Sequence, residues 1–138
     1  MIVLDSCAII EMARQSEGGK ALKLLMQTDE KAISCDLARA EMASVFRKLA
    51  RCEKLTPAEA GEYFIEALAL VDEFYSIDDL ETEALRESIR LDHSTYDIFY
   101  FVLARRTGAT LFTLDRKLMQ LCLDHGVDCI VGVQNVNR

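Results

Sequence analysis

Short apolar runs and longer helical stretches take turns along the whole chain. The apolar runs cover residues 2–5, 31–35, 73–77, 110–114 and 128–133. Each has the length and the β-branched or aromatic content of a buried strand, whereas the stretches between them carry apolar residues at helical spacing. This alternation predicts an α/β fold, in which a parallel sheet is covered by helices on both faces.

Several capping residues give the expected helices their ends. Thr56, Pro57 and Glu59 together form a clear helix start, with an N-cap, a proline at the first helical position and a capping box, and this helix is expected to reach about Val71. The other expected caps are Asp36, Asp78 or Asp79, and Asp115 at helix starts, and Gly108 and Gly126 at helix ends.

The length of 138 residues suits a single domain, expected to span residues 1–138. The first apolar run is broken at Asp5 and again at Glu11, too early for a signal peptide or a membrane span. We therefore expect a cytoplasmic protein with no membrane partner. The five cysteines are an odd number without CxxC spacing, so free and mostly buried thiols are expected, Cys7 among them.

The net charge of −7 argues against nucleic-acid binding, which usually relies on a basic surface. If four acids gathered around metal ions, however, only −3 would remain for the rest of the chain. The basic residues are also clustered along the sequence, at 39–54, 105–106 and 116–117. The total charge therefore does not exclude RNA as a partner.

Four acids are expected at one edge of the sheet. Asp5 ends the first strand, Glu41 lies early in the helix after the second, Asp97 begins the helix that leads to the fourth strand, and Asp115 follows that strand. Open α/β sheets place their sites at this edge. Gathered carboxylates repel one another unless a cation such as Mg²⁺ or Mn²⁺ neutralises them, and such ions activate water against phosphodiesters. Ordinary helix capping is the alternative interpretation, strongest for Asp115.

The motifs around these acids resemble the PIN domain, and in size and layout the VapC-type toxins. "IVLDSCAIIE" resembles the first PIN motif, and "CDLARAEMASVFRKL" resembles the second, of the form E-x-x-x-x-x-R. "STYDIFYFVLARRTGATLFTLDRKL" resembles the third and fourth motifs together. The resemblance covers nearly the whole chain and implies a three-layer sandwich with a parallel sheet of about five strands.

The resemblance also implies roles for individual residues. Asp5 and Asp97 would be direct metal ligands, Asp115 would bind a second ion or act through water, and Glu41 would orient the attacking water or act through water on the metal. Two hydroxyl residues, Ser6 and Thr113, would support the acids. The implied activity is Mg²⁺-dependent (or Mn²⁺-dependent) cleavage of single-stranded RNA without a covalent intermediate. The implied partners are the RNA substrate, a cognate antitoxin and a second copy of the chain in a homodimer.

Two other enzyme classes also place an Asp after the first strand. A haloacid-dehalogenase-type phosphatase requires a second Asp where this chain has Cys7, and a receiver domain requires paired acids and a late lysine that are missing. A PIN fold that binds RNA or protein without cutting stays open as the alternative function.

Two kinds of residue near the third motif have interpretations other than catalysis. His93 is expected to be a capping or surface residue, although a substrate contact is possible in principle. The aromatic residues between 96 and 101 cover more than one helix face, so most are expected in the core and one or two in a dimer interface.

Overall fold

The computed structural model describes residues 1–26 and 29–130. Its strands are β1 (Ile2–Leu4), β2 (Ala32–Cys35), β3 (Glu73–Tyr75) and β4 (Thr110–Phe112). Its helices are α1 (Ser6–Arg14), α2 (Glu17–Leu25), α3 (Leu37–Arg51), α4 (Pro57–Ala69), α5 (Glu81–Leu91), α6 (Thr95–Thr107) and α7 (Arg116–Asp124), with a short 3₁₀ helix, η1, at Ile77–Asp79.

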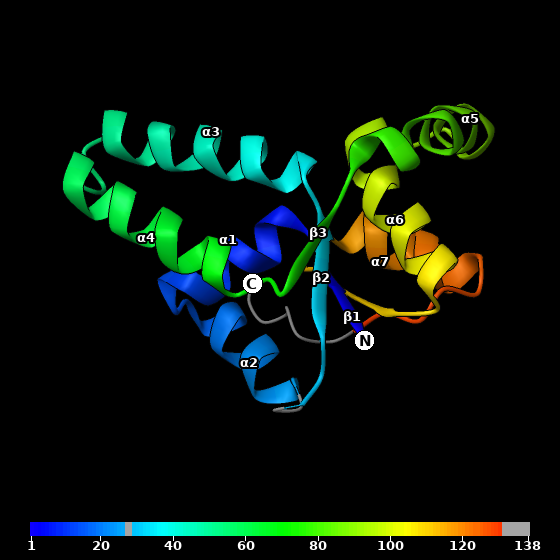
Figure 1. The fold of residues 1–138 in the computed structure, drawn as a ribbon, viewed down its shortest axis with the longest axis horizontal. Helices are drawn as coiled ribbons and strands as arrows, with labels where there is room; N and C mark the ends of the chain where they lie inside the picture. The colour runs from blue at the N-terminus through cyan, green and yellow to red at the C-terminus, as the bar shows by residue number, and fades with distance from the viewer. Residues whose placement is uncertain (27–28, 131–138) are drawn as a thin grey trace.

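The four strands form one parallel sheet in the order β3-β2-β1-β4. Helices α1 to α4 lie on one side of this sheet and α5 to α7 on the other, as Figure 1 shows, so the expected three-layer α/β architecture is confirmed. β1 pairs with β2 on one side and with β4 on the other, in the register Val3 to Ile33 and Val3 to Leu111. Strands β2 and β3 therefore extend the sheet on one side of β1, and β4 is added on the other side.

The expected fifth strand reduces to a single parallel bridge between Leu111 and Cys129 in the described residues. The described residues thus form four strands instead of about five. One bridge supplies too few backbone hydrogen bonds for a strand, and residues 131–133 of the expected strand lie outside the described ranges.

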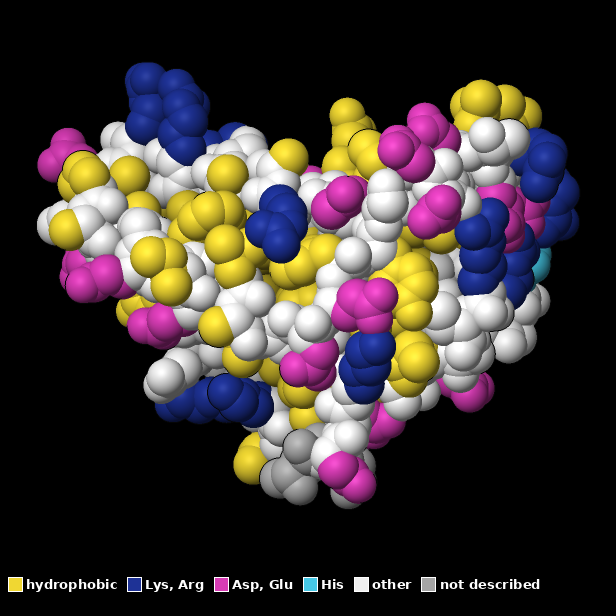
Figure 2. Space-filling view, viewed as in Figure 1, with side chains coloured by type: hydrophobic (Ala, Val, Ile, Leu, Met, Phe, Trp, Pro, Cys, Tyr) yellow, Lys and Arg dark blue, Asp and Glu magenta, His cyan; other side chains and the backbone are white. Residues whose placement is uncertain are grey.

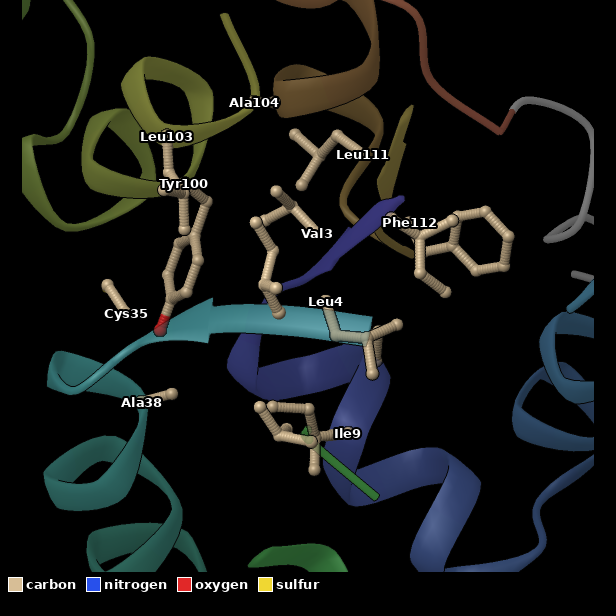
Figure 3. Close-up of a cluster of buried hydrophobic side chains, with 14 of the residues drawn as sticks. Val3, Leu4, Ile9, Cys35, Ala38, Tyr100, Leu103, Ala104, Leu111 and Phe112 are labelled. Atoms are coloured by element: carbon tan, nitrogen blue, oxygen red, sulfur yellow. The ribbon is translucent and has the colours of Figure 1, made fainter. Parts of the chain in front are cut away.

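The core consists of apolar side chains from both faces of β1 and its neighbours. Val3, Leu4 and Leu111 are fully buried, and Leu103 of α6 and Ile9 of α1 pack on them from opposite layers. Figure 3 shows this cluster, with the ring of Tyr100 reaching from α6 past the sheet toward α3. Because β1 is covered on both faces, its residues are continuously apolar up to the point where the strand ends.

Local sequence signals set most of the helix ends. The capping box of α4 is present, with the Thr56 side chain accepting from the Glu59 N–H at 3.1 Å and the Glu59 carboxylate accepting from the Thr56 N–H at 2.9 Å. Gly108 ends α6 with φ 70°, a left-handed conformation that glycine adopts without strain. None of the helices in the described ranges combines the length and apolarity needed to cross a membrane.

Two expected caps are wrong. Asp36 makes no side-chain bond to α3, because its Oδ1 accepts from the N–H of Ile77, 41 residues along the chain, at 3.0 Å. Neither Asp78 nor Asp79 caps α5, which begins at Glu81 without a side-chain cap, because this segment first forms η1.

Glycine is required at position 19 by the elbow between α1 and α2. A Cβ added to Gly19 would lie 1.9 Å from the carbonyl oxygen of Glu11. The two helices therefore contact each other backbone to backbone, on the side of the sheet that they share with α3 and α4 (Figure 1).

Candidate active site

Asp5 is the first residue after β1 and caps α1. Its Oδ1 accepts from the Ala8 N–H at 2.8 Å, and the hydroxyl of Thr113 donates to its Oδ2. Only 5% of the residue is exposed. Both carboxylate oxygens are therefore held in place by bonds to two different elements, α1 and the end of β4.

Burial raises the pKa of Asp5 to about 7. The bonds from Thr113 and Ala8 act in the opposite direction, and the negative charges of Asp97 and Asp115 raise the pKa further. A carboxylate in this environment is stabilised by a proton or by a nearby cation. Such an environment is typical of functional sites, where buried acids lack a basic partner from their own chain.

Thr113 connects the first and last strands of the sheet. Its hydroxyl donates to Asp5 and accepts from the backbone N–H of Asp115 at 3.0 Å. The Oδ1 of Asp115 in turn caps α7 by accepting from the Leu118 N–H at 3.1 Å. Asp5 and Asp115 are thus helix N-caps, and both also lie at the sheet edge where the four acids were expected. Helix capping and membership of an acidic site therefore do not exclude each other.

Asp97 lies in the first turn of α6 and is half-buried. Burial raises its pKa, the charge of Asp115 adds to that rise, and a contact with His93 opposes it. The Oδ2 of Asp97 lies 3.1 Å from Nε2 of His93. The structure therefore brings Asp5, Asp97 and Asp115 close enough for their charges to act on one another. These three residues are called the acidic group below.

Glu41 is held in place by a tyrosine. Its Oε1 accepts a hydrogen bond from the hydroxyl of Tyr100 at 2.6 Å, between α3 and α6. Only 2% of Tyr100 is exposed, and burial, followed by the charges of Cys35 and Glu41, raises its pKa well above the usual range. The tyrosine therefore stays protonated and acts as a fixed donor to Glu41.

Ser6 does not support the acids in the way that the sequence predicts. It begins α1 and is half-exposed, and in the described part of the chain its hydroxyl makes no hydrogen bond. The bonds that hold Asp5 come from Ala8 and Thr113 instead.

A family model for the PIN domain matches residues 2–122 of this chain. The chain belongs to the PIN domain family. PIN domains are typically metal-dependent nucleases. A solved structure, PAE2754 from Pyrobaculum aerophilum, matches this PIN domain with a TM-score of 0.69 and 21% sequence identity, covering 86% of this chain and 82% of the other. A search of curated proteins finds no match.

The carboxylates of the four acids of this PIN domain are suitable ligands for a hard divalent cation. All four acids offer carboxylate oxygens, the ligand type that Mg²⁺ and Mn²⁺ prefer, and a cation would relieve the repulsion among them. Within residues 1–26 and 29–130, however, no three His, Cys, Asp or Glu side chains lie close enough together to hold one ion. The residue types are therefore those of a metal site, whereas the side chains do not converge on a single point.

Two contacts of the PIN site escaped the sequence. The pair His93 and Asp97 is four residues apart, but His93 lies before α6 begins, so helical spacing does not predict the contact. The bond from Tyr100 to Glu41 joins residues 59 apart, and no local signal indicates it. Tyr100 and Phe101 are core residues as expected, whereas Tyr96 is 61% exposed.

All five cysteines are free, as expected, but only Cys35 and Cys122 are buried. Cys7 is exposed, which corrects its expected burial. Desolvation around its sulfur, followed by the charges of Asp5 and Glu11, nevertheless raises the pKa of Cys7 to about 12. A thiol that stays protonated is a poor nucleophile, so Cys7 offers no catalytic chemistry here.

Proposed function

We propose that this protein is a Mg²⁺-dependent, or Mn²⁺-dependent, endonuclease for single-stranded RNA and the toxin of a type II toxin–antitoxin pair. The observation that carries the proposal is the buried Asp5, held by Thr113 at the end of β1. Burial raises the pKa of Asp5 to about 7, and the nearby charges of Asp97 and Asp115 add to that rise. A buried carboxylate beside two further acids favours binding of an external cation, which supports a metal-dependent activity for this PIN domain.

In this proposal each acid has a separate task. Asp5 and Asp97 hold the metal directly, Asp115 contacts a second ion or acts through water, and Glu41 orients the attacking water or acts through water on the metal. The bound ion would lower the pKa of water and stabilise charge on the phosphate. Thr113 keeps Asp5 in one orientation, and Tyr100 does the same for Glu41.

The proposed partners follow from the same resemblance. A cognate antitoxin would insert an Arg or Lys side chain into the acidic group of Asp5, Asp97 and Asp115, which form no ion pair with a Lys or Arg in the described part of the chain. A homodimer is the proposed assembly. Growth arrest on expression of the wild type, absent with Asp5→Asn, would support the toxin role independently of any assay in vitro.

The nuclease activity is tested by cleavage of a mixed RNA pool with Mg²⁺ or Mn²⁺ and with EDTA. We expect cutting that requires the metal and falls at least a hundredfold, on the order of the loss of a key catalytic group, in Asp5→Asn and Asp97→Asn. Asp124→Asn, which removes an exposed carboxylate at the far end of α7, is the matched control and should keep full activity.

Three results would contradict the nuclease proposal. They are no cutting by the wild type with either metal, equal cutting in EDTA, and undiminished cutting by the folded Asp5→Asn variant. A wild type that binds RNA without cutting it would instead support a non-catalytic RNA-binding module.

A further inference from the structure

The cations on α3 make no ion pair with any residue in the described part of the chain. They are Arg39, Arg47, Lys48 and Arg51, and all four are exposed. After Glu41 the helix contains no further acid. A protein of net charge −7 has ample carboxylates to neutralise these cations, yet it leaves this helix positive.

The neighbouring helix α4 carries negatively charged residues on the side that faces α1. The two helices pack through aromatic side chains, with Phe46 of α3 against Tyr63 at 6.4 Å between ring centroids. The acids Glu59, Glu62 and Glu66 of α4 line a hollow with Arg14 of α1. Figure 2 shows the separation, with dark blue side chains over the end of α3 and magenta ones over α4. The arm formed by α3 and α4 therefore has a basic side and an acidic side.

The basic side of α3 leads away from Glu41. Glu41, Ser44, Lys48 and Arg51 follow one another at steps of three or four residues, so they lie along one side of the helix. At 1.5 Å per residue, Arg51 lies about 15 Å along the helix from Glu41. Arg39 is engaged elsewhere, because its guanidinium lies 4.2 Å from the centroid of the Phe74 ring.

An exposed aromatic residue directly precedes Asp97 in α6. Tyr96 is in the first turn of α6, next to Asp97 and one helical turn before Tyr100, whose hydroxyl bonds to Glu41 on α3. Residues four apart share a helix face, so Tyr96 lies on the α3-facing side of α6 with 61% of its surface exposed. A ring in this place offers a stacking surface for an unpaired base, as in other proteins that bind single strands.

We propose that α3 and the start of α6 form a track for single-stranded RNA, in which Lys48 and Arg51 hold phosphates and Tyr96 stacks on a base beside the acids. The track rests on the proposed nuclease function and gives it a direction: the strand leaves the acids along α3. The carboxylates of an acidic protein would also pair with Lys48 and Arg51, but the exposed ring of Tyr96 favours a partner with nucleobases.

The test is binding of a short, fluorescently labelled single-stranded RNA, measured by anisotropy across a salt series in the Asp5→Asn background, where cleavage does not interfere. Lys48→Gln with Arg51→Gln should weaken binding about tenfold and make the slope of log K against log salt shallower by about 1.4, because each phosphate contact on a single strand contributes about 0.7. Lys20→Gln with Lys23→Gln removes two exposed cations from α2 and should change neither quantity.

Tyr96 is tested with the same RNA and with its duplex. Tyr96→Ala should weaken single-strand binding about tenfold, and Tyr96→Phe should restore it, because stacking needs the ring and not the hydroxyl. The duplex should bind both variants equally, because its bases are already stacked.

Unchanged affinity and salt slope in the Lys48 and Arg51 variant would overturn the track and assign this side of α3 to another partner. An equal effect of Tyr96→Ala on duplex and single strand would overturn the stacking role. These failures are separate from failure of the proposed function. Cleavage by the wild type with unaffected binding in the variants would keep the nuclease and reject the track, and impaired binding without any cleavage would do the reverse.

Discussion

The two ends of helix α6 hold carboxylates in opposite environments. At its start, Asp97 joins Asp5 and Asp115, and burial together with mutual repulsion raises the pKa of Asp5 to about 7. At its end, Arg105 and Arg106 bind the carboxylates of α5. Hydrogen bonds from Arg90 and Arg105 lower the pKa of Glu87 to about 2.

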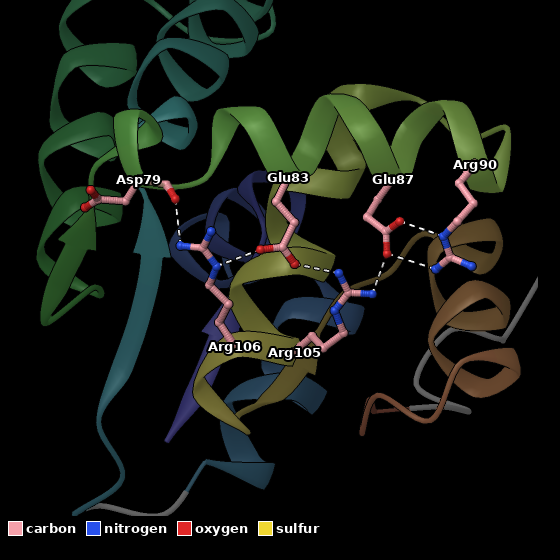
Figure 4. A network of polar contacts seen from close by, with 6 residues as sticks. All are labelled: Asp79, Glu83, Glu87, Arg90, Arg105 and Arg106. Atoms are coloured by element: carbon pink, nitrogen blue, oxygen red, sulfur yellow. Dashed lines mark hydrogen bonds and ion pairs between the residues drawn. The ribbon is translucent and has the colours of Figure 1, made fainter.

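Figure 4 shows how completely the second cluster is neutralised. Arg106 Nε lies 2.8 Å from Glu83 Oε1, Arg105 Nη1 lies 2.6 Å from Glu87 Oε1, and Arg90 Nε lies 2.7 Å from Glu87 Oε2. Each of these acids has a cation from its own chain, so the cluster ties α5 to α6 and needs nothing from solution. At the other end of α6 no Lys or Arg among the described residues pairs with Asp5, Asp97 or Asp115, and His93 contacts only Asp97. A proton or an external cation would stabilise these acids, as is typical of functional sites.

The largest expected effect is a gain in stability when Asp5, the most buried of the three acids at the start of α6, loses its negative charge. The pKa of Asp5 is raised by folding from the usual 3.8, so the unfolded chain releases this proton first and the free energy of unfolding falls between about pH 4 and pH 7. Asp5→Asn removes this penalty and should raise the free energy of unfolding at pH 8, without metal, by at most about 4 kcal/mol. Urea unfolding at pH 8 and pH 4.5 measures it, and the gain should shrink at the lower pH. A less stable variant at pH 8 would contradict this interpretation of Asp5.

Metal should stabilise the wild type through the same acids. Any ligand that binds only the folded state adds about 2.7 kcal/mol at a hundred times its Kd. We expect Mg²⁺ or Mn²⁺ at pH 8 to raise the melting temperature of the wild type in a concentration-dependent way, and to have little effect on Asp5→Asn or Asp97→Asn. Thermal unfolding with and without EDTA provides the measurement. Equal shifts in all three proteins would place the metal elsewhere.

Glu87→Gln should lower the stability of the protein, because it breaks the ion pairs between α5 and α6. The pKa of Glu87 is lowered by folding, so its contribution is present above the usual pKa of 4.5 and is lost as the pH falls toward 2. The variant should melt a few degrees below the wild type at pH 7 and match it near pH 2, while RNA cleavage per folded molecule stays unchanged. A loss of cleavage without a loss of stability would show that the two ends of α6 are not separate.

The smallest expected effect comes from Tyr100→Phe, which removes one hydroxyl and keeps the buried ring. The lost hydrogen bond to Glu41 should cost about 1 kcal/mol of stability and lower cleavage by about tenfold, mainly through kcat, because Glu41 is then free to turn. Tyr63→Phe, which removes a hydroxyl from α4 without touching Glu41, is the control. Unchanged kcat in Tyr100→Phe would remove this tyrosine from the site.

The parts of the fold that follow from neighbouring residues were readable in the sequence. A buried run that stops at a charge located the end of β1 and Asp5, and a threonine, a proline and a glutamate in order marked the start of α4. The edge rule for parallel sheets then predicted that acids at the ends of different strands would meet, and the structure places Asp5, Asp97 and Asp115 near one another.

The parts that depend on distant residues were not readable. Asp36 has the residue type and position of an N-cap, but a backbone N–H from residue 77 takes its carboxylate. Helix α6 is apolar on nearly every face, so its periodicity could not show that Tyr100 is buried against Glu41 while Tyr96, one turn earlier on the same side, is exposed. Only the placement of α3 against α6 decides which of the two rings is covered.

The hydroxyl of Thr113 bonds to a carboxylate 108 residues earlier in the chain. During synthesis Asp5 leaves the ribosome among the first residues, and its partner follows only after most of the domain has been made. At about 5 to 20 residues per second, several seconds pass between the two. β4 is also the strand that completes the pairing of β1, so the bond that holds Asp5 cannot form before residue 113 has been made. Any activity that depends on the Asp5 carboxylate therefore has to wait until most of the domain has left the ribosome.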